Sequence, residues 1–246
     1  MKLHAPILMY HHVGDPPPGS TNPALYVPEK KFAGQMEMMA AGGWSTMGLG
    51  ELAGILSGRA HRSRRRFVVT FDDGFADGLS AAAPILERHG FAATFFVCSG
   101  AAGRKIAWER SKETVPCPTL AWKQMRELAA RGHSIGGHTR SHVRLGDLSP
   151  DRVREEIVSD KRAIEENLGA GIDSFCYPYG DYSPEAAAAA REAGYLAAVS
   201  NRRGNRHEPQ DLYCLRRITV FRSLGAARLN LRLGLLYHVE HALRGD

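Results

Sequence analysis

Short apolar segments alternate with amphipathic ones along the whole chain. Between them, apolar residues recur at helical spacing, which is typical of βα units that build a parallel sheet. The pattern predicts an α/β fold in a single domain over residues 1–246, as a barrel or as a doubly wound sheet. The expected strands are residues 6–12, 67–72, 93–98, 134–139, 175–179, 196–200 and 215–220.

The ends of two helices are marked by residues that start or stop helices. Ser149 and Pro150 provide an N-cap and a first-turn proline, and Gly169 supplies the left-handed residue that ends such a helix. Thr119 is expected to cap another helix, which stops at Gly132.

Composition narrows the class of protein without naming a chemistry. The 246 residues are 43% hydrophobic and 24% charged, and 13 Pro with 26 Gly are too few for a collagen-like or low-complexity chain. The net charge of +6 raises the question of an anionic partner. Residues 59–66 form a basic cluster that lacks interleaved aromatic residues. A solvated loop is therefore the preferred interpretation, and nucleic-acid binding is the less favoured one.

Cysteine spacing and hydropathy bear on the compartment. The four Cys residues form no CxxC pair, which predicts four reduced thiols. No apolar run reaches the length of a membrane span, and residues 1–10 lack a small-residue cleavage site. From the chain as given we expect a cytoplasmic protein. A shortened chain would give the same pattern, and the cell envelope would then be the expected location.

Two adjacent carboxylates follow one predicted strand directly. In VVTFDDG, Asp72 and Asp73 come where residues 67–72 end, and the carboxyl ends of parallel strands form the active-site face. Neighbouring carboxylates repel each other unless one is neutralised, and a bound cation is a common solution. An Asx turn that satisfies local amides is the alternative, and on this motif alone it is slightly preferred.

A pair of histidines follows another predicted strand. His138 and His142 are four residues apart, so we expect their imidazoles to meet on one face of a helical turn. Two His and one carboxylate leave a coordination position open for water, as in catalytic zinc or iron sites. One such pair among 11 His is weak evidence, but its combination with the Asp pair is stronger.

The segment FCYPYG, residues 175–180, ends a third strand among aromatic residues. Pro178 fixes the backbone, so the amide of the next residue can point into a cleft as an oxyanion donor. A strand terminator with two packed tyrosines is about equally plausible on local grounds.

Taken together, these motifs resemble those of the polysaccharide deacetylase family, the carbohydrate esterases with a NodB-type domain. The matching segments cover most of the chain in order: PILMYHHV, TFDDG, GHSIGGHTRSH, FCYPYG and LRRITV. The YPYG letters indicate a subgroup of that family. The resemblance implies a distorted, incomplete TIM-like barrel with about seven strands.

The resemblance also implies a site and a reaction. Asp73, His138 and His142 would hold one divalent metal ion, with zinc preferred and nickel, cobalt or iron suited to the same ligands. Asp72 would be the general base, and the backbone N–H of Tyr179 would bind the oxyanion. The implied reaction removes an acetyl group, usually the N-acetyl of a glucosamine unit, from a carbohydrate substrate.

The chain departs from the family pattern at two places. Cys176 occupies the position of an Arg that orients the catalytic Asp in many members, so Arg217 or Arg216 is expected to take that role, with Arg217 fitting the pattern better. The general acid is not marked. His11 and His12 are candidates, whereas His238 lies in a segment that reads as an amphipathic helix.

Three other functions remain open from the sequence. One is a related amidase that opens a small cyclic amide or imide, which would need a closed pocket. Another is a catalytically inactive carbohydrate-binding relative, favoured by the missing Arg and the unmarked acid. The third is nucleic-acid binding through residues 59–66. If residue 1 is the true start, an intracellular or membrane-linked glycan precursor is the expected substrate.

Overall fold

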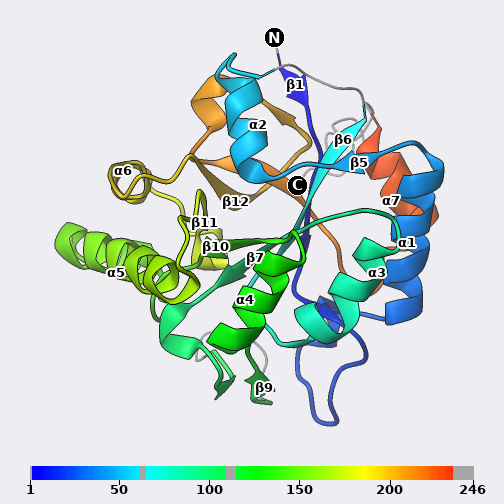
Figure 1. The fold of residues 1–246 in the computed structure, drawn as a ribbon, viewed down its shortest axis with the longest axis horizontal. Coiled ribbons are helices and arrows are strands. Elements are labelled where there is room, and N and C mark those ends of the chain that lie inside the picture. The colour runs from blue at the N-terminus through cyan, green and yellow to red at the C-terminus, as the bar shows by residue number, and fades with distance from the viewer. Residues whose placement is uncertain (1, 61–64, 109–114, 235–246) are drawn as a thin grey trace.

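Seven parallel strands close into a barrel in the computed structural model, which describes residues 2–60, 65–108 and 115–234 (Figure 1). Closure comes from β2, which pairs with β14 on one side and with β6 on the other. The predicted TIM-like barrel with fewer than eight strands is confirmed. In order around the barrel the strands are β2 (Ile7–Tyr10), β14 (Leu215–Thr219), β12 (Ala197–Arg203), β11 (Ser174–Cys176), β10 (Ser134–Gly137), β7 (Thr94–Val97) and β6 (Arg66–Phe71).

Helices surround the barrel, and short strands extend it at its rims (Figure 1). The helices are α1 (Glu29–Ala41), α2 (Leu49–Leu56), α3 (Ala83–Glu87), α4 (Trp122–Ala130), α5 (Pro150–Leu168), α6 (Pro184–Glu192) and α7 (Ala226–Leu233). β5 (Ser45–Thr46) lies beside β6. The other short pairs are β1 (Leu3–His4) with β13 (Arg206–His207), β3 (His12–Val13) with β4 (Tyr26–Val27), and β8 (Lys105–Ile106) with β9 (Cys117–Pro118).

Two predicted helix ends can be compared with the structure. α5 begins at Pro150 and ends before Gly169, whose φ of 70° is the left-handed conformation expected there. The predicted cap of α4 is wrong, because Ala121 rather than Thr119 is its N-cap. The Thr119 hydroxyl instead donates to the carbonyl oxygens of Ala101 and Arg104, so a local loop bond replaces the cap.

Alternate residues of the strands divide between two apolar clusters. Leu8, Phe71 and Phe95 pack with residues of α1, α3 and α4 outside the barrel. Ile7 and Val68 belong to a second cluster, which fills the barrel interior and includes residues of α2. Side chains alternate between these two faces along each strand. A polar residue on the interior face at the carboxyl end of a strand therefore lies at the rim of the barrel.

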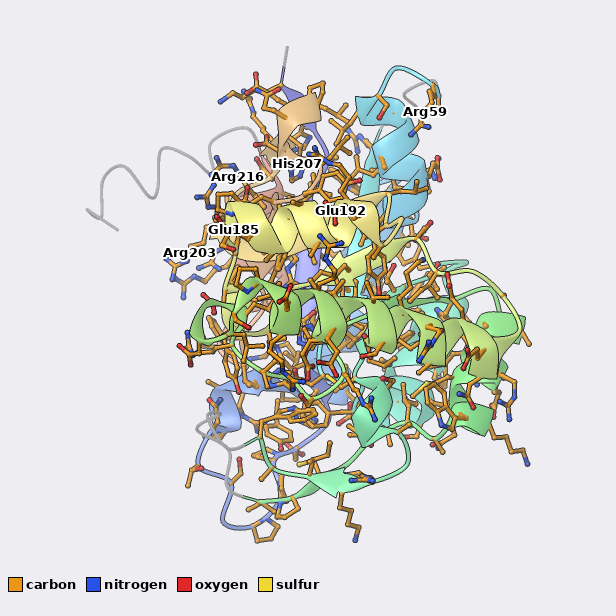
Figure 2. All side chains as sticks on the ribbon, turned by 90° about the vertical axis from the view of Figure 1, so that its left-hand side faces the viewer. Arg59, Glu185, Glu192, Arg203, His207 and Arg216 are labelled. Atoms are coloured by element: carbon orange, nitrogen blue, oxygen red, sulfur yellow. The ribbon has the colours of Figure 1, made fainter. Side chains whose placement is uncertain are left out.

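His207 of β13 is a buried histidine that ties the N-terminal segment to the barrel (Figure 2). Its Nε2–H donates to the Ala5 carbonyl oxygen over 2.9 Å, and no partner contacts its Nδ1 among the described residues. Burial lowers the pKa of His207 from 6.5 to about 4, although the bond to Ala5 opposes this effect. The folded protein therefore keeps this imidazole neutral at pH values where the unfolded chain protonates it.

We expect His207 to reduce stability in mild acid. The free-energy cost of keeping His207 neutral is absent above the pKa that it has in the unfolded chain. This cost grows as the pH falls toward the pKa in the folded protein, and it is constant below that value. Between about pH 7 and about pH 5 it should remove about 2 kcal/mol from the free energy of unfolding. His207→Gln can keep the bond to Ala5 without titrating. Urea unfolding at both pH values should show the smaller loss in His207→Gln, and an equal loss in both proteins would contradict this.

Within the described residues, no helix is both long and apolar enough to cross a membrane.

Candidate active site

Three potential metal ligands from two strand ends converge at the rim of the barrel. Asp73 follows β6, while His138 and His142 follow β10. Asp73 Oδ1 lies 3.3 Å from His138 Nε2 and 3.0 Å from His142 Nε2. One donor atom from each residue lies within 4.8 Å of the other two, and all three residues are buried. This donor set fits a divalent ion such as Zn²⁺, because two imidazoles and a carboxylate leave a position for a reactant.

The outer nitrogens of both imidazoles have partners that leave Nε2 facing Asp73. His138 Nδ1 lies 2.7 Å from the Cys176 carbonyl oxygen, and only a protonated Nδ1 can donate to it. His142 Nδ1 lies 3.2 Å from the Tyr179 hydroxyl. Such contacts fix ring orientation and are typical of histidines that bind metals through the other nitrogen.

The segment between the two histidines differs from the prediction. Residues 138–142 form an irregular loop instead of a helical turn, with φ of 62° at Thr139 and 56° at His142. The imidazoles still meet, with ring centroids 5.0 Å apart. Asp73 and Tyr179 also have positive φ, so four of the five such non-glycine residues in the described chain lie at this site. Strained conformations of this kind persist where the surrounding structure enforces them.

Asp72 forms a buried ion pair with Arg217 of β14. The guanidinium donates from Nη1 to Oδ1 over 2.7 Å and from Nη2 to Oδ2 over 2.8 Å. Asp72 is 4% exposed and Arg217 is 1% exposed. Many family members have an Arg at the position of Cys176 in β11 that orients the catalytic Asp. In this chain Arg217 of β14 takes that role. The half-buried Arg216 lies against Gly204 instead, and Figure 2 places it at the periphery.

Arg217 also connects several strand ends within the barrel. Its Nε donates to the Ser200 carbonyl oxygen, and its Nη1 donates to the Thr70 hydroxyl at 3.2 Å. Nη2 further contacts Cys176 Sγ at 3.3 Å and Asn201 Oδ1 at 3.0 Å. These partners fix the guanidinium, and so the carboxylate of Asp72, in one orientation.

The electrostatics of the site favour ionised carboxylates. Burial alone would raise the pKa of Asp72, but the charge and hydrogen bonds of Arg217 outweigh it and lower that pKa. Burial opposes ionisation of Asp73 in the same way, yet His142 and His138 hold its pKa well below the usual range. Burial lowers the pKa of His142, although Asp73 opposes this. An ionised Asp73 beside a neutral His142 suits a metal ion. Burial would lower the pKa of His138, but Cys176 and Asp73 raise it well above its usual value, so a bound ion must displace a proton from this imidazole.

The two candidate acids after β2 have different surroundings. His12 is stacked between Tyr26 and Phe75, and its Nδ1 lies 2.6 Å from Asp77, which indicates a packing role. His11 follows Tyr10, which pairs in register with Phe71, so His11 lies level with Asp72 on the neighbouring strand. It also interacts electrostatically with Asp72, Asp73 and Arg217.

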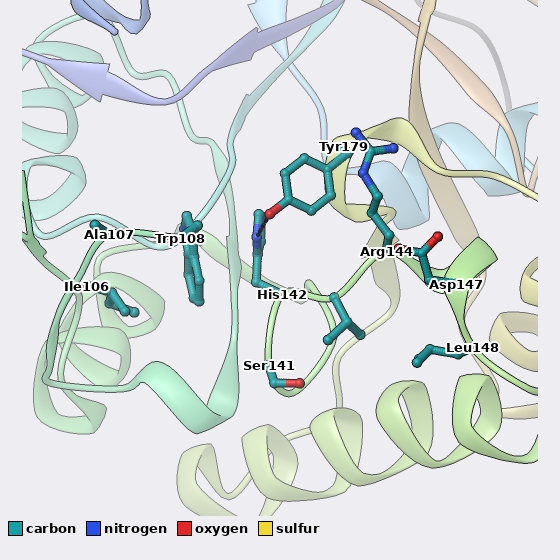
Figure 3. A pocket seen from close by; sticks show the side chains of 10 residues that line it. Ile106, Ala107, Trp108, Ser141, His142, Arg144, Asp147, Leu148 and Tyr179 are labelled. Carbon is teal, nitrogen blue, oxygen red and sulfur yellow. Dashed lines mark hydrogen bonds between the residues drawn. The ribbon is translucent and has the colours of Figure 1, made fainter. Parts of the chain in front are cut away.

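A cavity of about 490 Å³ adjoins His142 (Figure 3). The His142 ring lies between Trp108, stacked at 4.2 Å between centroids, and Tyr179. The Arg144 guanidinium lies over the Tyr179 ring at 4.6 Å. The lining includes exposed residues, among them Arg144 and Asp147, so the cavity is a groove that is open at the surface.

Sequence reasoning missed several residues that surround this site. Asn201, just after the apolar part of β12, carried a usable signal as a polar residue near a strand end. Trp108 follows no readable pattern, and Glu156 and Asp160 resemble ordinary helix acids, yet both acids contact the loop of His138 and His142.

Two sequence interpretations concern segments outside or partly outside the described residues. His238 lies beyond them, so its placement is not described. In the basic cluster, residues 61–64 are not described either. Of the rest, Arg65 donates to the Gly42 carbonyl oxygen and Arg66 pairs with Glu51 at 2.7 Å, so these two side chains serve local structure.

Comparison with known proteins gives consistent matches. The family model described as polysaccharide deacetylase matches residues 59–198. The putative polysaccharide deacetylase YxkH of Bacillus subtilis is 30% identical over 215 residues, which are 87% of this chain and 71% of that protein. A chitooligosaccharide deacetylase of Bradyrhizobium is 30% identical over 141 residues, 55% of each chain.

A solved structure matches over a longer span. The Streptococcus pyogenes deacetylase PplD, in complex with acetate, superposes with a TM-score of 0.84 at 26% identity. The match covers 95% of this chain and 100% of that one. The fold of the described residues is therefore that of a deacetylase barrel.

Proposed function

The chain belongs to the polysaccharide deacetylase family and is a hydrolase of amide bonds, and from this premise we propose that it removes the N-acetyl group of glucosamine units in a glycan. The observation that carries the proposal is the convergence of Asp73, His138 and His142 within 4.8 Å, directly beside Asp72. The proposed general base and the three metal ligands all lie together, which argues against a catalytically inactive carbohydrate-binding relative.

The residues divide the reaction among them. A divalent ion held by Asp73, His138 and His142 would polarise the acetyl carbonyl and acidify a water molecule. Asp72, kept ionised and oriented by Arg217, takes the proton from the attacking water. The backbone N–H of Tyr179 is proposed as a donor to the oxyanion, supported by the left-handed turn that sets Tyr179 against His142.

The shape of the groove favours a glycan over a small cyclic amide or imide. The latter substrate would require a closed pocket, whereas the cavity beside His142 is lined by exposed residues on one side. Trp108 and Tyr179 line this groove, and aromatic rings suit the apolar faces of sugar rings. PplD was solved with acetate, the product expected of deacetylation, which is consistent with the same reaction here.

Removal of metal should abolish deacetylation. Protein treated with a chelator is expected to release acetate from N-acetylglucosamine oligomers at least about 100-fold more slowly, since the ion supplies several kcal/mol of charge stabilisation. Zn²⁺ or Co²⁺ should restore the wild type but not His138→Ala, and elemental analysis should show that this variant has lost its ion. Full metal content in His138→Ala, or hydrolysis of a cyclic imide without acetate release from any acetylated sugar, would overturn the proposal.

His11 is proposed as the general acid that protonates the leaving amine nitrogen, on the basis of its position level with Asp72. Burial lowers the pKa of His11, and the charges of Asp73 and Asp72 oppose this effect by favouring the protonated imidazole. His11→Gln should lower kcat on the N-acetyl substrate by about 10²-fold to 10⁴-fold. An activated aryl acetate, whose leaving group needs no proton, should be hydrolysed with a much smaller loss. Equal losses on the two substrates would show that His11 is not the acid. His89→Gln, at a partly exposed histidine outside the site, is the control.

A further inference from the structure

Helix α5 presents two buried acids to the metal-ligand loop, residues 138–142. Glu156 and Asp160 lie one turn apart and are 7% and 0% exposed. Acidic residues are almost never this buried unless they are paired. In the part of the chain that the structure describes, neither forms an ion pair with Lys or Arg. Their partners are instead groups of the loops at the rim.

Asp160 joins two of these loops. Its Oδ2 accepts the backbone N–H of His138 over 3.0 Å, and its Oδ1 accepts the N–H of Ser99 over 2.8 Å. Ser99 begins a short turn after β7, and Gly100 of that turn donates to the Arg140 carbonyl oxygen. One carboxylate thus fixes the first ligand and fastens the loop to the neighbouring strand end.

Glu156 holds the middle of the same loop. Its Oε2 accepts the N–H of Ser141 over 3.0 Å, and its Oε1 accepts the Ser141 hydroxyl over 2.8 Å. Ser141 lies between Thr139 and His142, the two residues with positive φ. Bonds at Ser141 therefore support the backbone turns that aim the second ligand at Asp73.

The close approach of Asp160 depends on a glycine at the end of β10. A Cβ at Gly137 would lie 3.0 Å from Asp160 Oδ2 and only 2.2 Å from the Tyr195 hydroxyl. No larger residue would leave room for both groups beneath the His138 amide. The strand end and the helix are thus built to let this carboxylate reach the loop.

We propose that Asp160 and Glu156 are positioning residues that preset His138 and His142 for the metal ion, so that a helix contributing no ligand sets the metal affinity. The inference rests on the proposed function, which places an ion between these histidines and Asp73. Without its two acid anchors, the loop would have to be ordered at the cost of binding energy when the ion arrives.

The test compares metal affinity in variants of the same helix. Asp160→Asn and Glu156→Gln each replace one acceptor oxygen by an NH2 group, which cannot accept a hydrogen bond, and each should weaken Zn²⁺ binding about 10-fold to 100-fold in competition with a chromogenic chelator. Glu155→Gln is the matched control, because Glu155 is the neighbouring residue but is exposed and pairs only with Arg152 among the described residues. Ser141→Ala removes the hydroxyl bond alone and should have a smaller effect.

Spectra of the Co²⁺ form separate positioning from general stability. If the anchors orient the ligands, the visible absorption bands of bound Co²⁺ should shift in Asp160→Asn and Glu156→Gln but not in Glu155→Gln. Unchanged affinity and spectra in the folded variants would overturn the inference, even if melting temperatures fall. If Asp160→Asn does not fold, Glu156→Gln and Ser141→Ala decide the outcome. Wild-type binding that survives His138→Ala would instead refute the metal site itself, and the inference with it.

Discussion

Asp72→Asn is expected to lower kcat for acetate release by about 10²-fold to 10⁴-fold, the range associated with loss of a general base. Asparagine keeps the size of the side chain and one acceptor for Arg217, but it cannot take a proton from the attacking water. The metal content should be unchanged, because the ligand set is Asp73, His138 and His142. Rates at matched metal content therefore isolate the proton transfer.

The control for this variant is Asp173→Asn. Asp173 immediately precedes β11 and so lies at the opposite end of the barrel from the ligands, and its loss should leave kcat unchanged. A rate for Asp72→Asn within a factor of about three of the wild type would exclude Asp72 as the base. Loss of the ion in Asp72→Asn would mean that Asp72 is itself part of the metal site.

The barrel could be predicted because most of its strands lie in short apolar runs. All seven expected segments overlap a barrel strand, since burial on both faces favours apolar residues along a parallel strand. The ends of parallel strands meet at one rim, so the order of motifs also indicated that Asp73, His138 and His142 would be neighbours. These outcomes follow from local composition together with a general rule of topology.

The conformation of the ligand loop could not be predicted in the same way. Spacing of four residues suggested a helical turn, but Thr139 and His142 adopt left-handed conformations that isolated residues avoid. Bonds from Glu156 and Asp160 support that backbone, and both acids are distant in sequence from the motif. From the sequence alone these two acids cannot be distinguished from the exposed Glu155, because the burial of a helical residue depends on what packs against it.

Which of Arg216 and Arg217 pairs with Asp72 also could be decided only from the structure. A period of two places Arg217 on the same face of β14 as Leu215, which belongs to the interior cluster. The sequence alone could not say which face of this strand lines the interior, since one Arg lies on each. The charged side chain of Arg217 can be buried in the barrel interior because Asp72, which follows β6, pairs with it there.

Arg217→Met should therefore destabilise the folded protein strongly. It leaves the Asp72 carboxylate buried without its cation, and removal of one partner from a buried pair costs about 3–5 kcal/mol. Chemical unfolding of the metal-free protein measures the effect. Arg216→Met, at the neighbouring half-buried position against Gly204, should change the free energy of unfolding by about 0.5 kcal/mol or less.

A double variant shows whether the cost comes from the unpaired charge. In Asp72→Asn with Arg217→Met, no ionised group is left without a partner, so this protein should be more stable than Arg217→Met alone although it carries one more substitution. If the double variant is as unstable as the sum of the single ones, the two side chains do not interact energetically. The loss would then come from the bonds of Arg217 to Ser200, Thr70 and Asn201. If the double variant recovers stability but not activity, that result would show that the ion pair maintains the Asp72 carboxylate in the barrel for catalysis rather than for folding.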